Sequence, residues 1–181
     1  MRIGVVAELT AAGIDATFFE ADAGEPAALS SAFAQIRQQL GEASVLIYNG
    51  FAMRMASPSK TTPEDLLADL RTNVGGALAA THEVLPAMRA AKRGTILFTG
   101  GGFALDPVPQ FASVGVGKAA LRNLALSLAK ELNPDGIHVA TVTICGMVKA
   151  GSHFDPDQIA TKFLELHQQA PDSFDAEFVY R

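Results

Sequence analysis

The sequence has 181 residues, of which 49% are hydrophobic and 18% are charged. This length and balance predict one globular domain with enough apolar side chains for a sizeable core. The formal net charge is −5 and no basic cluster occurs, so the sequence offers no electrostatic footprint for nucleic acid or for an anionic membrane.

Cys145 is the one cysteine, which excludes an internal disulfide and a cysteine metal cluster. The histidines show no ligand spacing, so we expect no metal site. The opening residues lack the apolar core of a signal peptide, and no run approaches the roughly 20 apolar residues of a membrane span. We therefore expect a cytoplasmic protein, because a single free thiol suits a reducing compartment.

Two interpretations are open for residues 1–13. Val5, Leu9 and Ala12 have helical spacing and Gly13 follows as a stop, which favours a helix. The alternative is a short strand over RIGVVA. Residues 16–21, ATFFEA, predict a buried strand.

Two further stretches have clear helical signals. Residues 26–40 carry an apolar residue every three or four positions, and Gly41 follows. Thr62 and Pro63 form a good helix start, since a hydroxyl cap precedes proline at the first helical position. That second helix is expected to continue to residue 91.

Strands and helices then alternate to the end of the chain. Apolar runs predict strands at 44–50, 95–99 and 137–144, and a last strand in AEFVYR. Helices are expected at 117–132 and about 157–169. This alternation predicts an α/β fold with a mostly parallel sheet flanked by helices.

Residues 94–132, GTILFTGGGFALDPVPQFASVGVGKAALRNLALSLAKEL, resemble the catalytic half of a short-chain dehydrogenase/reductase. In that family a strand ending in serine precedes a helix with Tyr-x-x-x-Lys. Lys118 fits the lysine, but Val114 stands four residues earlier at the tyrosine position. Gly101, thirteen residues before Val114, stands at the serine position.

The resemblance implies a Rossmann-like fold and an NAD(P) cofactor, but the two replacements remove chemistry. The family's tyrosine transfers a proton and its serine orients the substrate oxygen, whereas Val114 and Gly101 have no titratable group or side-chain donor. Losing a positioned general acid or base costs about 10²–10⁴-fold in rate. Thr99 has the hydroxyl nearest in sequence to Gly101. A threonine at the end of a strand more commonly hydrogen-bonds to the backbone than takes part in catalysis.

Five other positions match family elements. Asn73 corresponds to a catalytic asparagine in a helix kink, and Asn49 with Gly50 corresponds to part of an Asn-Asn-Ala-Gly turn beside the cofactor. Gly146 lies where Pro-Gly usually borders the nicotinamide. Asp22 has two interpretations, an adenine contact or a helix cap. The resemblance thus makes Lys118 and Asn73 catalytic and places Asp22, Asn49, Gly50, Lys118 and Gly146 at the cofactor.

The resemblance begins in the middle of the family's domain, so 1–181 is one partial Rossmann-like domain that lacks the first βαβ unit. That unit holds the Gly-rich turn that cradles the pyrophosphate, in roughly 30 or more residues. Two outcomes follow: the strand at 16–21 pairs directly with 44–48, which we favour, or the sheet stays incomplete.

Two functions are therefore carried forward. One is an NAD(P)-linked oxidoreductase by descent that is weakly active or inactive as this chain. The other is a non-catalytic binding or scaffold protein that dimerises through the family's helices. The small residues at 75–80 and the leucines at 121, 124, 128 and 132 predict two apolar faces and hence a homodimer or higher homo-oligomer.

Overall fold

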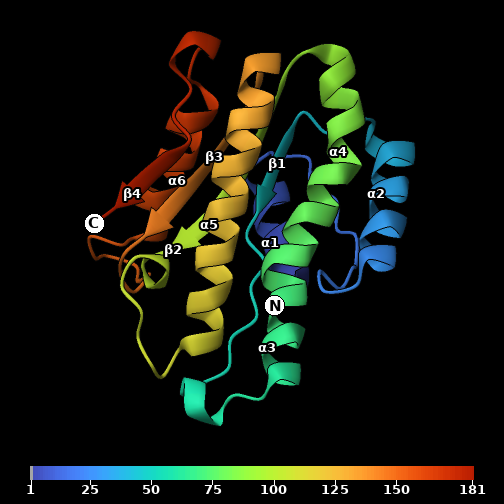
Figure 1. Cartoon of the computed structure of the whole chain (residues 1–181). Helices are drawn as coiled ribbons and strands as arrows, with labels where there is room; N and C mark the ends of the chain where they lie inside the picture. The colour runs from blue at the N-terminus through green and yellow to red at the C-terminus, as the bar shows by residue number, and fades with distance from the viewer. Residues whose placement is uncertain (1) are drawn as a thin grey trace.

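A computed structural model describes residues 2–181 of this protein. Its sheet consists of four parallel strands (Figure 1). The strands lie side by side in chain order, and they are β1 (Val45–Tyr48), β2 (Gly94–Gly101), β3 (Ile137–Ile144) and β4 (Glu177–Tyr180). Because every strand is parallel to its neighbour, all carboxyl ends meet at one edge of the sheet. The predicted α/β class is confirmed.

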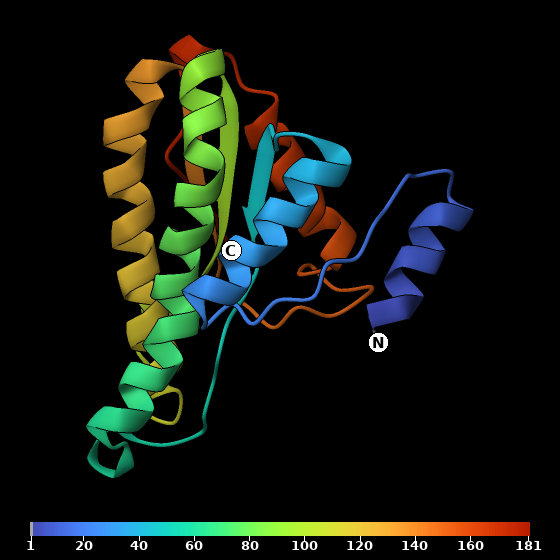
Figure 2. The same cartoon turned by 90° about the vertical axis from the view of Figure 1, so that its right-hand side faces the viewer.

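Helices cover both faces of this sheet (Figure 2). The helices are α1 (Arg2–Ala11), α2 (Pro26–Leu40), α3 (Pro63–Leu70), α4 (Ala77–Ala91), α5 (Ala112–Leu132) and α6 (Pro156–His167). Figure 2 shows α4 and α5 on one face and α6 on the other. The two faces follow from the period of a strand, which sends alternate side chains to opposite sides.

The core is densest around β2 and β3. Ile96, Phe98 and Val139 are fully buried against α4 and α5. Leu97 and Val142 point to the other face and pack with the residues of α6. Strands buried on both faces read as continuous apolar runs, which is why these two were recognisable in the sequence.

The predicted start of α3 is confirmed. Thr62 caps the helix by accepting a hydrogen bond from the backbone N–H of Asp65 at 3.1 Å, and Pro63 is at the first helical position. Between α3 and α4 the chain runs through a π-helical segment, Arg71–Gly76. Such segments occur often at functional sites, and this one contains Asn73.

The prediction for residues 16–21 is wrong. Residues 2–11 form the favoured helix, but 16–21 form no strand and do not pair with β1. β1 consequently lies at the edge of the sheet, and Ile47 on it is 52% exposed. An apolar run gives a strand only where another strand lies beside it, and residues 16–21 are not assigned to the sheet.

The expectation of a separate leucine face is also wrong. Leu121, Leu128 and Leu132 are buried within a single chain, and Leu124 packs partly against the same core. Gly76 and Ala77 of the small-residue run are buried too. These residues bring α4 and α5 onto the sheet, so they leave no unused apolar face of the kind predicted.

Candidate functional site

The carboxyl ends of β1 and β2 form the candidate site, because most residues singled out in the sequence meet there. Ligands of open parallel sheets bind outside this edge. β1 leads into Asn49 and Gly50, and β2 ends at Gly101. α5 then carries Lys118 alongside β2.

Lys118 lies half-buried with its amine against the end of β2. Its Nζ donates a hydrogen bond to the backbone carbonyl oxygen of Thr99 at 2.6 Å. The ring of Phe51 lies below it, 5.8 Å from Nζ to the centroid. Burial lowers the pKa of this lysine to about 8, because an apolar environment disfavours the charged form.

Gly101 and Val114, at the positions compared with the family's serine and tyrosine, lie close to this lysine. Val114 is one helical turn before Lys118 on α5 and is 4% exposed. Gly101 packs along the lysine stem, since a β-carbon placed there would lie 3.3 Å from Cγ of Lys118. The spacing seen in the sequence therefore corresponds to real proximity between Gly101 and Lys118.

Asn73 is fully buried and clamps the loop after β1. Its Oδ1 accepts a hydrogen bond from the backbone N–H of Ala52 at 2.7 Å, and its Nδ2 donates to the Ala52 carbonyl at 3.0 Å. α5 passes close by, because a β-carbon at Gly117 would lie 2.6 Å from Asn73 Nδ2. Asn73 therefore joins the π-helical segment, the loop after β1 and the turn of α5 that carries Lys118.

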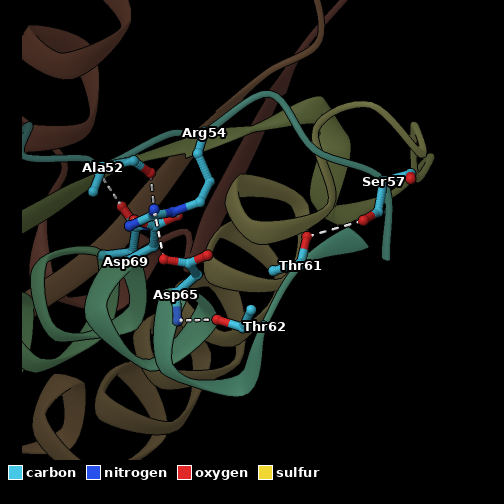
Figure 3. A network of polar contacts seen from close by, with 8 residues as sticks. Ala52, Arg54, Ser57, Thr61, Thr62, Asp65 and Asp69 are labelled. Atoms are coloured by element: carbon cyan, nitrogen blue, oxygen red, sulfur yellow. Dashed lines mark hydrogen bonds and ion pairs between the residues drawn. The ribbon is translucent and has the colours of Figure 1, made fainter. Parts of the chain in front are cut away.

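A second clamp on the same loop was not predicted from the sequence (Figure 3). Arg54 donates to both carboxylate oxygens of Asp69 at 3.1 Å and to Asp65 at 2.8 Å. Burial opposes ionisation of Asp69, but the hydrogen bonds and positive charge of Arg54, together with the Ser113 hydroxyl, outweigh burial and lower the pKa of that carboxyl. The sequence feature that could have indicated this clamp is the spacing of Asp65 and Asp69, because residues four apart lie on one face of a helix.

Asp22 lies on the approach to α2. Its Oδ1 accepts a hydrogen bond from Gly24 N–H at 2.8 Å, and the N-cap of α2 is Glu25. The helix-cap interpretation of Asp22 is therefore wrong. Asp22 also lies near Tyr48, whose pKa is raised to about 12 by burial and by this charge.

Tyr48 has a structural role at the end of β1. Its hydroxyl donates to the backbone carbonyl of Thr72 at 2.5 Å, and its ring lies against Gly50. Gly50 and Gly76 leave room for this ring, since a β-carbon at either position would crowd it. Tyr48 thus fastens β1 to the π-helical segment.

Asn49 faces a groove of about 520 Å³ on the side of the sheet covered by α6. The groove is mostly apolar and is lined in part by Ile47, Leu97, Ile159 and Phe163, with no Lys or Arg among its lining residues. A diphosphate needs cationic side chains or a run of free backbone N–H groups. The groove therefore does not fit the pyrophosphate of a dinucleotide.

Gly146 follows β3 at the same edge of the sheet. The ring of Phe154 occupies the space where a β-carbon of residue 146 would lie. Close packing by Phe154 accounts for this glycine without a cofactor. Lys118, Gly101 and Asn73 are thus brought together, and Asp22 lies near Tyr48 at the carboxyl end of β1.

A metal site requires a cluster of ligand side chains, and a membrane span requires a long apolar helix. No group of three or more His, Cys, Asp or Glu side chains is gathered as metal ligands within residues 2–181. None of the described helices combines the length and apolarity needed to cross a bilayer.

A parallel sheet between helical layers, with polar residues at its carboxyl edge, defines a Rossmann-like α/β protein. The family model for short chain dehydrogenases matches residues 3–155. The chain belongs to this family.

Solved structures share the fold over nearly the whole chain. A metagenomic short-chain oxidoreductase in complex with NADP is 27% identical, with a TM-score of 0.88, and the match covers 99% of this chain and 79% of that one. A short-chain dehydrogenase from Rhodopseudomonas palustris is 26% identical, with a TM-score of 0.86, and the match covers 99% and 80% of the two chains.

Curated relatives match over a shorter stretch. A very-long-chain 3-oxoacyl-CoA reductase of Aspergillus niger is 40% identical over 103 residues, 56% of this chain and 30% of that protein. An oxidoreductase of Sarocladium schorii is 32% identical over 116 residues, 64% of this chain and 46% of that protein. The chain thus matches less than half the length of either relative.

Proposed function

We propose that this protein is an NAD(P)-linked oxidoreductase by descent whose 181-residue chain is weakly active or inactive. The observation that carries the proposal is the pairing of Lys118 with Gly101 at the end of β2, with Val114 one turn earlier on α5. The scaffold that holds a catalytic lysine is in place. At the positions where the family has hydroxyls that act on a substrate oxygen, this chain has Gly101, which has no side chain, and Val114, which has an aliphatic one.

The chemistry that remains is limited to positioning. Lys118 donates a hydrogen bond to a backbone carbonyl oxygen and not to a tyrosine hydroxyl. Both polar atoms of the Asn73 side chain are hydrogen-bonded to the backbone of Ala52. When bound, NAD(P) would supply a hydride. Asp22, Asn49, Gly50, Lys118 and Gly146 could make peripheral contacts with it, but the groove offers no cationic partner for a diphosphate.

The experiment is a spectrophotometric assay of carbonyl reduction with NADH and NADPH. We expect no turnover from the chain itself, nor from the double variant Val114→Tyr with Gly101→Ser. The proton donor and the cofactor cradle are separate deficits, so restoring the first leaves the second. Clear turnover by the double variant with NADPH would contradict the proposed lack of a cofactor cradle, and circular dichroism would establish that each variant folds.

The second candidate is a cytoplasmic non-catalytic binding or scaffold protein that self-associates. It is favoured by the open edge of β1, where unpaired backbone groups are a ready template for another strand. Ile47 is 52% exposed there. We propose a second copy of the chain as the partner at this edge, in a homodimer or a higher homo-oligomer.

Sedimentation equilibrium tests self-association. A dimer at tens of micromolar is expected, and Ile47→Glu should shift it towards monomer because a charge then faces its symmetry mate. Leu67→Glu on α3 is the matched control, since Leu67 is also exposed, at 60%. A single monomeric species for the unmodified chain would refute self-association.

A further inference from the structure

Lys118 has an environment that differs from that of an ordinary surface lysine. The polar partner of its amine is a neutral carbonyl oxygen, that of Thr99, at 2.6 Å. No carboxylate of the described residues lies within ion-pair distance of it, whereas Lys162 pairs with Glu165 at 2.9 Å. An amine without a carboxylate partner gains little from carrying a charge.

Apolar groups enclose the rest of the side chain. The ring of Phe51 lies 5.8 Å from Nζ, and Gly101 lies along the stem. Val114 occupies the preceding turn of α5, where it supplies no hydroxyl. The amine is therefore free of the hydroxyl partner that the family resemblance implies for this lysine.

The Lys118 residue is partly exposed to solvent. Phe51 is 58% exposed, and Thr99, whose carbonyl accepts from Lys118, lines the open groove. Gly101 adds no side chain beyond its α-carbon.

We propose that Lys118 is a nucleophilic amine that condenses reversibly with small apolar aldehydes, an activity separate from hydride transfer. The neutral Nζ lone pair attacks the aldehyde carbon, and the carbonyl π electrons move to oxygen, which takes up a proton. The carbinolamine then loses this oxygen as water, and a C=N bond replaces the C=O bond. The overall change is amine plus aldehyde to imine plus water, with no oxidant or reductant.

A lowered pKa increases the fraction of reactive amine at neutral pH. With a pKa of about 8, Lys118 is roughly a tenth neutral at pH 7, compared with well under a thousandth for an unperturbed lysine. Desolvated lysines act as nucleophiles for this reason. The lower basicity offsets part of the gain, so we expect labelling about 10-fold faster than for an exposed lysine.

The test is short exposure of the intact protein to acetaldehyde with sodium cyanoborohydride, which traps the imine as a secondary amine, followed by peptide mapping. Lys130 is an internal control, because it is exposed on the same helix, α5. The expected result at pH 7 is about 10-fold faster modification of Lys118 than of Lys130. The Lys118 rate should level off above about pH 8 while that of Lys130 still rises.

A pair of variants separates chemistry from folding. Phe51→Asp places a carboxylate beside Nζ and favours the charged amine, whereas Phe51→Asn has similar size and no charge. Both changes are at an exposed position and leave the core intact. Slower labelling of Lys118 in F51D than in F51N is expected. Equal rates in the two variants, or Lys118 labelling no faster than Lys130, would overturn the proposal.

Discussion

The interior strands β2 and β3 and the edge strand β1 differ in what lies beside them. β2 and β3 have a strand on each side and helices on both faces, and Phe98 and Val142 on them are fully buried. β1 has one neighbouring strand, and Ile47 is half-exposed beside a groove. The first region has complete packing, whereas the second has the sequence of a buried strand without the partners that would bury it.

This difference separates the scaffold that positions Lys118 from the side of the sheet where we propose that a cofactor site is lacking. The helices that place Lys118 are held by the β2–β3 core, which is complete within this chain. The cofactor's pyrophosphate would be held on the β1 side, where the sheet ends. The position of a lysine is therefore no evidence that the neighbouring cofactor site is present.

The largest expected effect is from truncating the complete core. Phe98→Ala should lower the free energy of unfolding by about 3–5 kcal/mol, because a fully buried aromatic side chain leaves a cavity. Ile47→Ala on β1 should cost less than about 1 kcal/mol, since half of that side chain is already in water. Urea unfolding monitored by circular dichroism measures both, and equal losses would contradict the contrast between the two regions.

A smaller effect is expected from the half-buried lysine. The pKa of Lys118 in the folded chain is lowered to about 8, so between about pH 8 and pH 10 the unfolded chain binds more protons and stability rises with pH. This contribution is on the order of 2 kcal/mol across that window. Lys118→Met should remove this rise in the free energy of unfolding between about pH 8 and pH 10, and Lys130→Met should retain it.

A still smaller effect is expected at the loop clamp of Figure 3. The lowered pKa of Asp69 stabilises the folded chain above the unfolded value, near pH 4, and the contribution is lost as pH falls through the folded pKa. Arg54→Ala should therefore reduce the urea midpoint at pH 6 and much less at pH 3. Arg54→Lys should lower the urea midpoint less than Arg54→Ala does. A decrease in the midpoint that is the same at both pH values would contradict an ionic role.

The sequence predicted the complete region better than the edge. β3 was expected at 137–144 and has those bounds, and the cap at Thr62 was recognised from its own residues. Residues 16–21 have the composition of a strand, but pairing depends on a neighbour that composition does not reveal. The leucines of α5 have the period of an apolar face, yet the period alone did not show that one chain buries nearly all of it.

The site was predicted in the same uneven way. The spacing between Gly101 and Lys118 corresponds to close approach in the structure, and Asn73 lies in an irregular helical segment as the resemblance implied. The Arg54 clamp was missed because Arg54 lies in a loop whose path is set by tertiary contacts. Asp22 could not be placed from the sequence, since its environment depends on segments distant in the chain.

Calorimetric titration of the 181-residue chain with NADPH and with NADH tests the central claim most directly. The claim is that a complete β2–β3 core holds Lys118 in a family scaffold whose cofactor cradle is absent. We expect no saturable binding at low micromolar concentrations of either nucleotide, because no Lys or Arg lines the groove beside β1 to bind the pyrophosphate. Saturable binding in that range would contradict the account.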